Sequence, residues 1–241
     1  MLWVSLLSGV VLAACHLLPA KLRALHARPR SRWLSAFAGI SVAYVFVHLL
    51  PEVAAHNEVV AESMNRAVAG RLIWLLTLGG FVLFYGLERM AQCRVSEDAR
   101  RDDSVFWLHI GSFAFYNAVV AFLLVDRPPG EERHAELSLA WYTLAMGLHF
   151  IVNDFGLREH HRHAYDRIGK WILIAAIAAG MTLALLTTVE AETLLCAVAF
   201  LAGGVMLNVI KEELPEERES RWWAFAAGAG AYATLLLFIA H

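Results

Sequence analysis

Long apolar runs separated by short polar loops cover most of the chain. They lie at about residues 2–18, 33–51, 72–87, 105–125, 137–157, 171–189, 193–210 and 222–240. Each is close to the roughly 20 residues that a helix needs to cross a hydrocarbon core about 30 Å thick. Because lipid cannot satisfy backbone polar groups, each run is interpreted as an α-helix rather than a strand. The pattern predicts an all-α protein with eight transmembrane helices in one domain, residues 1–241.

Composition supports a membrane protein and excludes several other classes. The 241 residues are 59% hydrophobic and 17% charged, whereas soluble domains have about 25% charged residues. The three cysteines lie in unrelated segments, which favours neither a disulfide framework nor a thiolate metal cluster. No long basic run and no phosphate-binding glycine-rich loop is present. We therefore expect no nucleic-acid partner, no organic cofactor and no enzymatic activity.

The positive charges predict how the helices are oriented. All but four of the 20 Lys and Arg residues fall in the first, third, fifth and seventh loops. The exceptions are Arg66, Arg71, Arg127 and Arg133. By the positive-inside rule the richly basic loops are cytoplasmic, so both termini lie on the non-cytoplasmic side. The compact loops favour a bacterial inner membrane as the location.

Two segments of the sequence resemble each other without a gap. Residues 38–52, at the end of the second run, and residues 202–216, at the end of the seventh, both begin with Ala-Gly and end with Leu-Pro-Glu. One would run outward and the other inward, which predicts an inverted repeat of the kind found in secondary transporters. Chance similarity between apolar helices, each ended by a proline, is the alternative. A repeat implies three spans, two central spans and three inverted spans.

The fifth run carries the polar residues best suited to chemistry. Asp154 is the only formally charged side chain well inside an apolar run, and a buried carboxylate in a membrane indicates a functional site. His149 and Asn153 are four residues apart and project from one helical face, with Met146 one turn before. Asn117 of the fourth run is expected at a similar depth. Imidazole and amide oxygen are ligands that divalent cations accept.

Acidic residues and histidines also gather at the ends of two other runs. His48 and Glu52 are one turn apart at the predicted outer end of the second run, where they would form a cation-attracting mouth. Glu212 and Glu213 close the seventh run on the predicted cytoplasmic side. Solvated interfacial residues without a metal are the alternative for each of these groups.

These features together resemble the ZIP family of zinc- and iron-transporting membrane proteins. The resemblance rests on eight spans with both ends outside, HLLPE at 48–52, AGGVMLNVIKEELPEE at 202–217 and His149 in the fifth run. It implies a three-plus-two-plus-three bundle, a metal site between the fourth and fifth spans, and transport of zinc, iron or a related ion into the cytoplasm. Glu212 and Glu213 fall where family members have a cytoplasmic exit site.

The chain departs from the family pattern at the metal site. In the fourth span the family has His-Asn followed by an acid, where this chain has Tyr116, Asn117 and Val120. In the fifth span both carboxylates are missing after His149, and Asp154 is the acid that would compensate. We therefore predict a carrier of divalent metal ions, zinc first and iron or manganese next, with a reduced metal site. Its predicted metal residues are His149, Asn153, Asp154, Asn117, His48, Glu52, Glu212 and Glu213.

Two other interpretations stay open at this point. A non-transporting relative, acting as a membrane metal sensor or scaffold, would explain the lost carboxylates. An intramembrane zinc hydrolase would need about three ligands that converge at one depth. The expected partners are the lipid bilayer, metal ions and, in a homodimer, a second copy of the chain.

Overall fold

The computed structural model describes residues 2–21, 32–51, 53–55, 66–94, 99–126, 135–213 and 221–239; most of these residues are helical, and no β-strand occurs among them. Each apolar range predicted from the sequence contains a helix, which confirms the all-α prediction. The helices are α1 (Leu2–Cys15), α2 (Arg32–Tyr44), the π-helical η2 (Val45–Leu49), α4 (Arg66–Arg94), α5 (Ala99–Val125), α6 (Ala135–His160), α7 (Arg162–Ala164), the π-helical η3 (Tyr165–Gly169), α8 (Lys170–Leu186), α9 (Ala191–Glu213) and α10 (Trp222–Ile239).

The helices α1 and α8 are shorter at their C-terminal ends than the apolar runs at 2–18 and 171–189 predicted. α1 ends at Cys15, and the backbone N–H groups of residues 16–18 donate to carbonyls three residues earlier in a tightened final turn. Pro19 follows, and the residue before a proline is disfavoured in a helix. α8 ends at Leu186 because Thr187 has extended backbone angles, φ −128° and ψ 149°. The early end of α1 places His16 in a turn.

Several helices have the length and apolar character of membrane spans. Five stretches of the described chain qualify: Arg32–Ala55, Arg71–Met90, Phe106–Val125, Arg162–Leu186 and Glu192–Ile210. Two shorter apolar helices are Leu2–Cys15 and Trp222–Leu237. Large apolar side chains such as Trp3 and Trp223 are 82% and 78% exposed, which an aqueous surface disfavours when many lie together. The helices are therefore compatible with an integral membrane protein.

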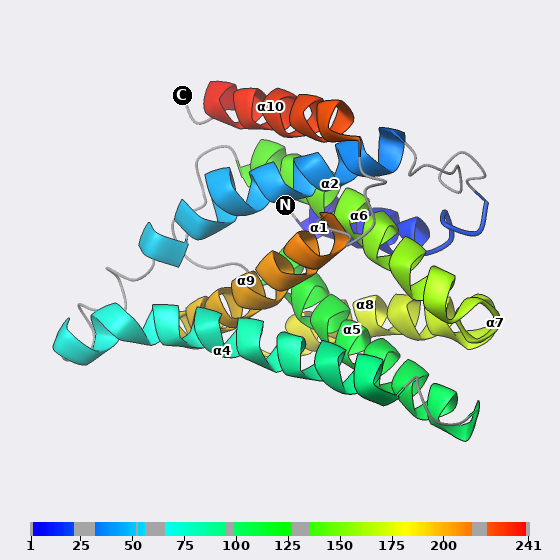
Figure 1. Ribbon diagram of the computed structural model, residues 1–241. Coiled ribbons are helices and arrows are strands. Elements are labelled where there is room, and N and C mark those ends of the chain that lie inside the picture. Colours follow the sequence, from blue (N-terminus) through cyan, green and yellow to red (C-terminus); the bar gives the residue numbers. More distant parts are fainter. Residues whose placement is uncertain are drawn as a thin grey trace.

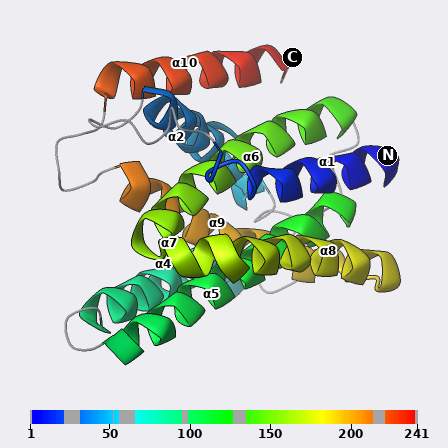
Figure 2. The same cartoon turned by 90° about the vertical axis from the view of Figure 1, so that its right-hand side faces the viewer.

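The helices pack as close pairs around a shared apolar interior. α10 lies along α2 at one edge of the molecule, and α4 lies at the opposite edge (Figure 1). α5 lies along α8, and α1 lies beside α6 (Figure 2). The main hydrophobic core includes Leu12 of α1, Tyr116 of α5, Phe150 of α6 and Val205 of α9. Residues from α5 and α6 therefore sit in the interior of the bundle.

Backbone contacts at glycine hold α2 against α10. A Cβ atom on Gly39 would lie 2.2 Å from the carbonyl oxygen of Phe225, and one on Gly228 would lie 2.2 Å from that of Ala36. No side chain fits at such distances, so only glycine permits this approach. Small residues at interfaces are the usual means by which membrane helices approach closely.

The contact between α9 and α4 has the same pattern. A Cβ atom on Gly203 would lie 1.8 Å from the Thr77 carbonyl oxygen, and one on Gly80 would lie 1.9 Å from that of Phe200. Gly203 matches Gly39 in the alignment of 202–216 with 38–52, and Phe200 and Ala36 each lie two residues before the start of the aligned segment. Equivalent positions of α2 and α9 therefore make equivalent backbone contacts, each with a different partner helix.

Candidate metal centre

His149 and Asn153 lie together on the buried face of α6. Asn153 Nδ2 is 3.3 Å from His149 Nε2, and both side chains are buried. The contact follows from helix geometry, because residues four apart lie one above the other on the same face. This confirms that the two residues share one face of α6.

Tyr116 of α5 faces this part of α6. Its ring centroid is 6.0 Å from that of His149, and its side chain is fully buried. Asn117, the next residue, donates from Nδ2 to the Phe113 carbonyl oxygen at 2.8 Å. Asn117 Oδ1 and Tyr116 Oη are both buried and have no hydrogen-bond partner among the described residues. We call His149, Asn153 and Tyr116, which these contacts bring together, and Asn117, which is next to Tyr116 in the sequence, the α5–α6 centre.

The α5–α6 centre offers neutral donors only. Its donors are an imidazole, two amides and a phenol, and an imidazole with oxygen donors suits borderline divalent cations. Two of its oxygen atoms have no partner, and buried polar atoms without partners are uncommon and require an explanation. Within the described chain, no three His, Cys, Asp or Glu side chains are grouped so as to hold a metal ion. Any ion here would depend on the amides and the phenol.

Asp154 is paired with a residue that the sequence analysis did not select. Its Oδ2 lies 2.5 Å from His16 Nδ1, and both residues are 1% exposed. Tyr165 of η3 fixes the same turn, because its hydroxyl donates to the His16 carbonyl oxygen at 3.2 Å. The one available signal was a lone histidine within the first apolar run. Asp154 as a metal ligand stays a prediction.

The other polar residues of α5 lie outside the centre. Ser112 donates its hydroxyl to the Leu108 and His109 carbonyl oxygens of its own helix. His109 Nε2 lies 3.3 Å from Glu88 Oε2 of α4. The ring of His109 also lies 5.7 Å from that of His161, which follows α6. These contacts bring the first half of α5 beside α4 and beside the residue that follows α6.

A salt bridge closes the same end of α6. Arg158 Nε donates to Asp166 Oδ1 at 2.7 Å, and its Nη2 donates to Oδ2 at 3.0 Å. This bidentate hydrogen bonding raises the pKa of the Arg158 guanidinium above its ordinary value. The pair connects the end of α6 to η3.

The structure describes only some of the residues of the predicted outer mouth and the predicted cytoplasmic exit. His48 lies in η2, partly buried, with its ring 5.3 Å from that of Tyr44. Glu52 lies outside the described residues. Glu212 and Glu213 end α9, and their side chains are not among those the structure describes. These assignments stay predictions.

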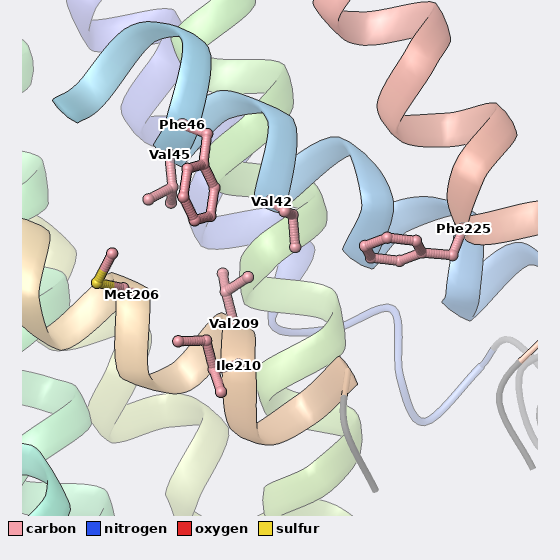
Figure 3. Close-up of a pocket in the computed structure, with 7 residues that line it drawn as sticks. All are labelled: Val42, Val45, Phe46, Met206, Val209, Ile210 and Phe225. Carbon is pink, nitrogen blue, oxygen red and sulfur yellow. The ribbon is translucent and has the colours of Figure 1, made fainter. Parts of the chain in front are cut away.

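An apolar pocket lies away from the centre, between α2, η2, α9 and α10. Its volume is about 170 Å³ and its opening is lined by seven apolar side chains (Figure 3). Six of them pair off in the alignment of the two similar segments: Val42 with Met206, Val45 with Val209, and Phe46 with Ile210. With no nitrogen or oxygen donor on these side chains, the pocket suits hydrocarbon rather than a hard cation.

Comparison of the chain with protein-family profiles, curated proteins and solved structures gave no match.

Proposed function

We propose that the protein is a ZIP-like membrane carrier that moves divalent metal ions, zinc first, toward the cytoplasm through the α5–α6 centre. The observation that carries this proposal is the centre itself. His149 and Asn153 of α6 face Tyr116 of α5 in the apolar interior, and two oxygen atoms there have no partner. Buried polar residues of this kind within a membrane bundle usually mark a substrate or ion pathway.

The equivalent contacts of α2 and α9 support an inverted repeat. The glycines of both helices meet a carbonyl oxygen of a partner helix at equivalent positions. Three residues at equivalent positions of each segment also line the apolar pocket. Inverted repeats with a site between the halves are a common construction of secondary transporters.

The orientation and the two ends of the path belong to the same proposal. The charge pattern favours an orientation with both termini on the non-cytoplasmic side, and the compact loops favour a bacterial inner membrane. Metal would enter past His48 and Glu52 and leave past Glu212 and Glu213. Downhill movement of the ion needs no nucleotide, in keeping with a chain that carries no Walker-type loop.

Metal uptake by proteoliposomes tests the proposal. Purified protein is reconstituted with a zinc-sensitive dye inside the vesicles, and uptake of zinc, iron and manganese is followed. We expect His149→Ala and Asn153→Ala to lower uptake by roughly tenfold or more, because each removes a donor or its hydrogen-bond partner. Thr143→Ala is the matched control, since Thr143 is buried on α6 and donates only to the Leu139 carbonyl oxygen.

Each result of the uptake experiment has a distinct meaning. Full uptake by His149→Ala would place the ion path elsewhere and refute the proposed centre. Equal loss in Thr143→Ala would show that any damage to α6 abolishes uptake. Absence of uptake by folded wild-type protein would refute transport.

A non-transporting metal sensor or scaffold is the second candidate function. The pairing of Asp154 with His16 favours it, because it leaves the centre with one histidine and no carboxylate. Such a centre would hold a divalent ion weakly. Metal binding without uptake, both lost in His149→Ala, would support this candidate over the carrier.

A further inference from the structure

The contact between His16 and Asp154 joins distant parts of the chain in the interior. His16 lies in the turn after α1, and Asp154 lies on α6, with a nitrogen–oxygen distance of 2.5 Å. The Tyr165 hydroxyl holds the His16 backbone from η3. The carboxylate therefore has a fixed partner that α6 does not provide.

Phe150 lies between this pair and the α5–α6 centre. Its ring is stacked on that of His16, with centroids 5.1 Å apart and an interplanar angle of 20°. It also contacts the rings of His149 at 6.4 Å and Tyr116 at 6.2 Å. The pair and the centre are thus neighbours that share one aromatic ring.

The two neighbouring groups differ in charge. Asp154 is the only acidic residue among the buried side chains of the described chain. A divalent ion at the centre would meet neutral donors, and its charge would be uncompensated in a medium that screens poorly. The contact with His16 Nδ1 occupies Asp154 Oδ2.

We propose that His16 sets the cation affinity of the α5–α6 centre by holding Asp154 away from it, an inference that rests on the proposed metal-carrying function. His16 is then a positioning residue that does not itself contact the ion. Replacing it with an apolar residue removes the imidazole partner of a buried carboxylate, which then keeps only its neutral contact with the Tyr165 side chain. A divalent ion at the centre becomes the favoured counter-charge. The wild-type chain binds its ion weakly, as release to the cytoplasm requires.

The test measures metal binding by the full-length protein in detergent. Zinc affinity is obtained by competition with a chromophoric chelator, and Co²⁺ reports the ligand set through its absorption spectrum. We expect His16→Leu to raise zinc affinity roughly tenfold or more through the freed negative charge. The double variant with Asp154→Asn returns to wild-type affinity. His16→Asn keeps an N–H donor for Asp154 and keeps wild-type affinity.

His109→Leu is the matched control for the loss of a histidine–carboxylate pair. It removes the contact with Glu88, in which the side chains are 13% and 17% exposed, and we expect unchanged zinc affinity. Asp154→Asn alone gives a second test that does not depend on the folding of His16→Leu. We expect its zinc affinity and Co²⁺ spectrum to match those of the wild type, because Asp154 does not bind the ion in the wild-type protein under this inference.

Several outcomes would overturn the inference. Unchanged or lower affinity in folded His16→Leu contradicts it, because a purely structural role predicts no gain. Loss of affinity in Asp154→Asn also contradicts it, since Asp154 would already be a ligand. If the wild-type protein binds zinc through His149 and His16→Leu shows no gain in zinc affinity, the inference about His16 fails and the proposed function stands. If no folded variant binds either metal, the proposed function fails together with it.

Discussion

Two fully buried tyrosines differ in what their hydroxyl groups contact. Tyr165 donates to the His16 carbonyl oxygen, whereas Tyr116 Oη has no hydrogen-bond partner among the described residues. A satisfied buried hydrogen bond contributes about 1 kcal/mol to stability, and an unsatisfied one costs a desolvation penalty. Tyr165 therefore has the signature of a structural residue. Tyr116 Oη offers a free donor and acceptor to the ion that we propose.

Phenylalanine substitutions separate these two roles. We expect Tyr165→Phe to lower the free energy of unfolding by about 1 kcal/mol. Tyr116→Phe, the matched control at another fully buried tyrosine, leaves stability unchanged or slightly higher and weakens zinc binding. Denaturant unfolding in detergent micelles measures the first effect, and chelator competition measures the second. Equal destabilisation by both changes would show that Tyr116 also has a structural partner.

Glycine positions at the level of helix pairs decide how closely the helices approach. Gly39, Gly80, Gly203 and Gly228 each meet a backbone carbonyl oxygen of the neighbouring helix. By contrast, a Cβ atom on Gly79 of α4 would meet nothing within 4 Å. Neighbouring glycines of α4 therefore have opposite roles, one at a helix contact and one on a free face.

Alanine at Gly203 should force α9 and α4 apart. We expect Gly203→Ala to lower the free energy of unfolding by about 1–3 kcal/mol, as is usual for overpacking. Gly79→Ala should be neutral or slightly stabilising, because alanine favours a helix and has room there. Thermal unfolding in detergent compares the two variants. A stable Gly203→Ala protein would show that the helices separate at little cost.

At the scale of the whole molecule, the alternation of charged loops predicts which side of the membrane each loop faces. The third predicted loop, between the apolar runs at 72–87 and 105–125, falls in the basic set, and the fourth, between the runs at 105–125 and 137–157, does not. The positive-inside rule places the first in the cytoplasm and the second outside. The proposed direction of metal movement depends on this orientation.

Reporter fusions in a bacterial host test the orientation. Alkaline phosphatase, which is active only outside the cytoplasm, should be active when fused within 127–134 and inactive when fused within 95–98. Green fluorescent protein, which fluoresces in the cytoplasm, should give the opposite pattern at the same positions. Reversed activities would show that the protein has the opposite orientation in the membrane. Equal activities at both positions would show that the segment between them does not cross the membrane.

The α6 face of the candidate site was predictable from the sequence, and the partner of Asp154 was not. His149 and Asn153 contact each other because they are four residues apart in a helix, and this spacing is visible in the sequence. His16 lies 138 residues before Asp154. No periodicity connects positions that far apart, so pattern analysis could select the buried acid but not its partner.

The sequence by itself determined the helical ranges, their apolar character and the residues that share a face of one helix. These properties depend on hydropathy and on the local geometry of the helix. Only the tertiary structure decided that Asp154 turns to His16, that Tyr116 completes the α5–α6 centre, and that four glycines meet carbonyl oxygens. Those contacts depend on which helices become neighbours and at what depth, and both are set by packing across the whole bundle.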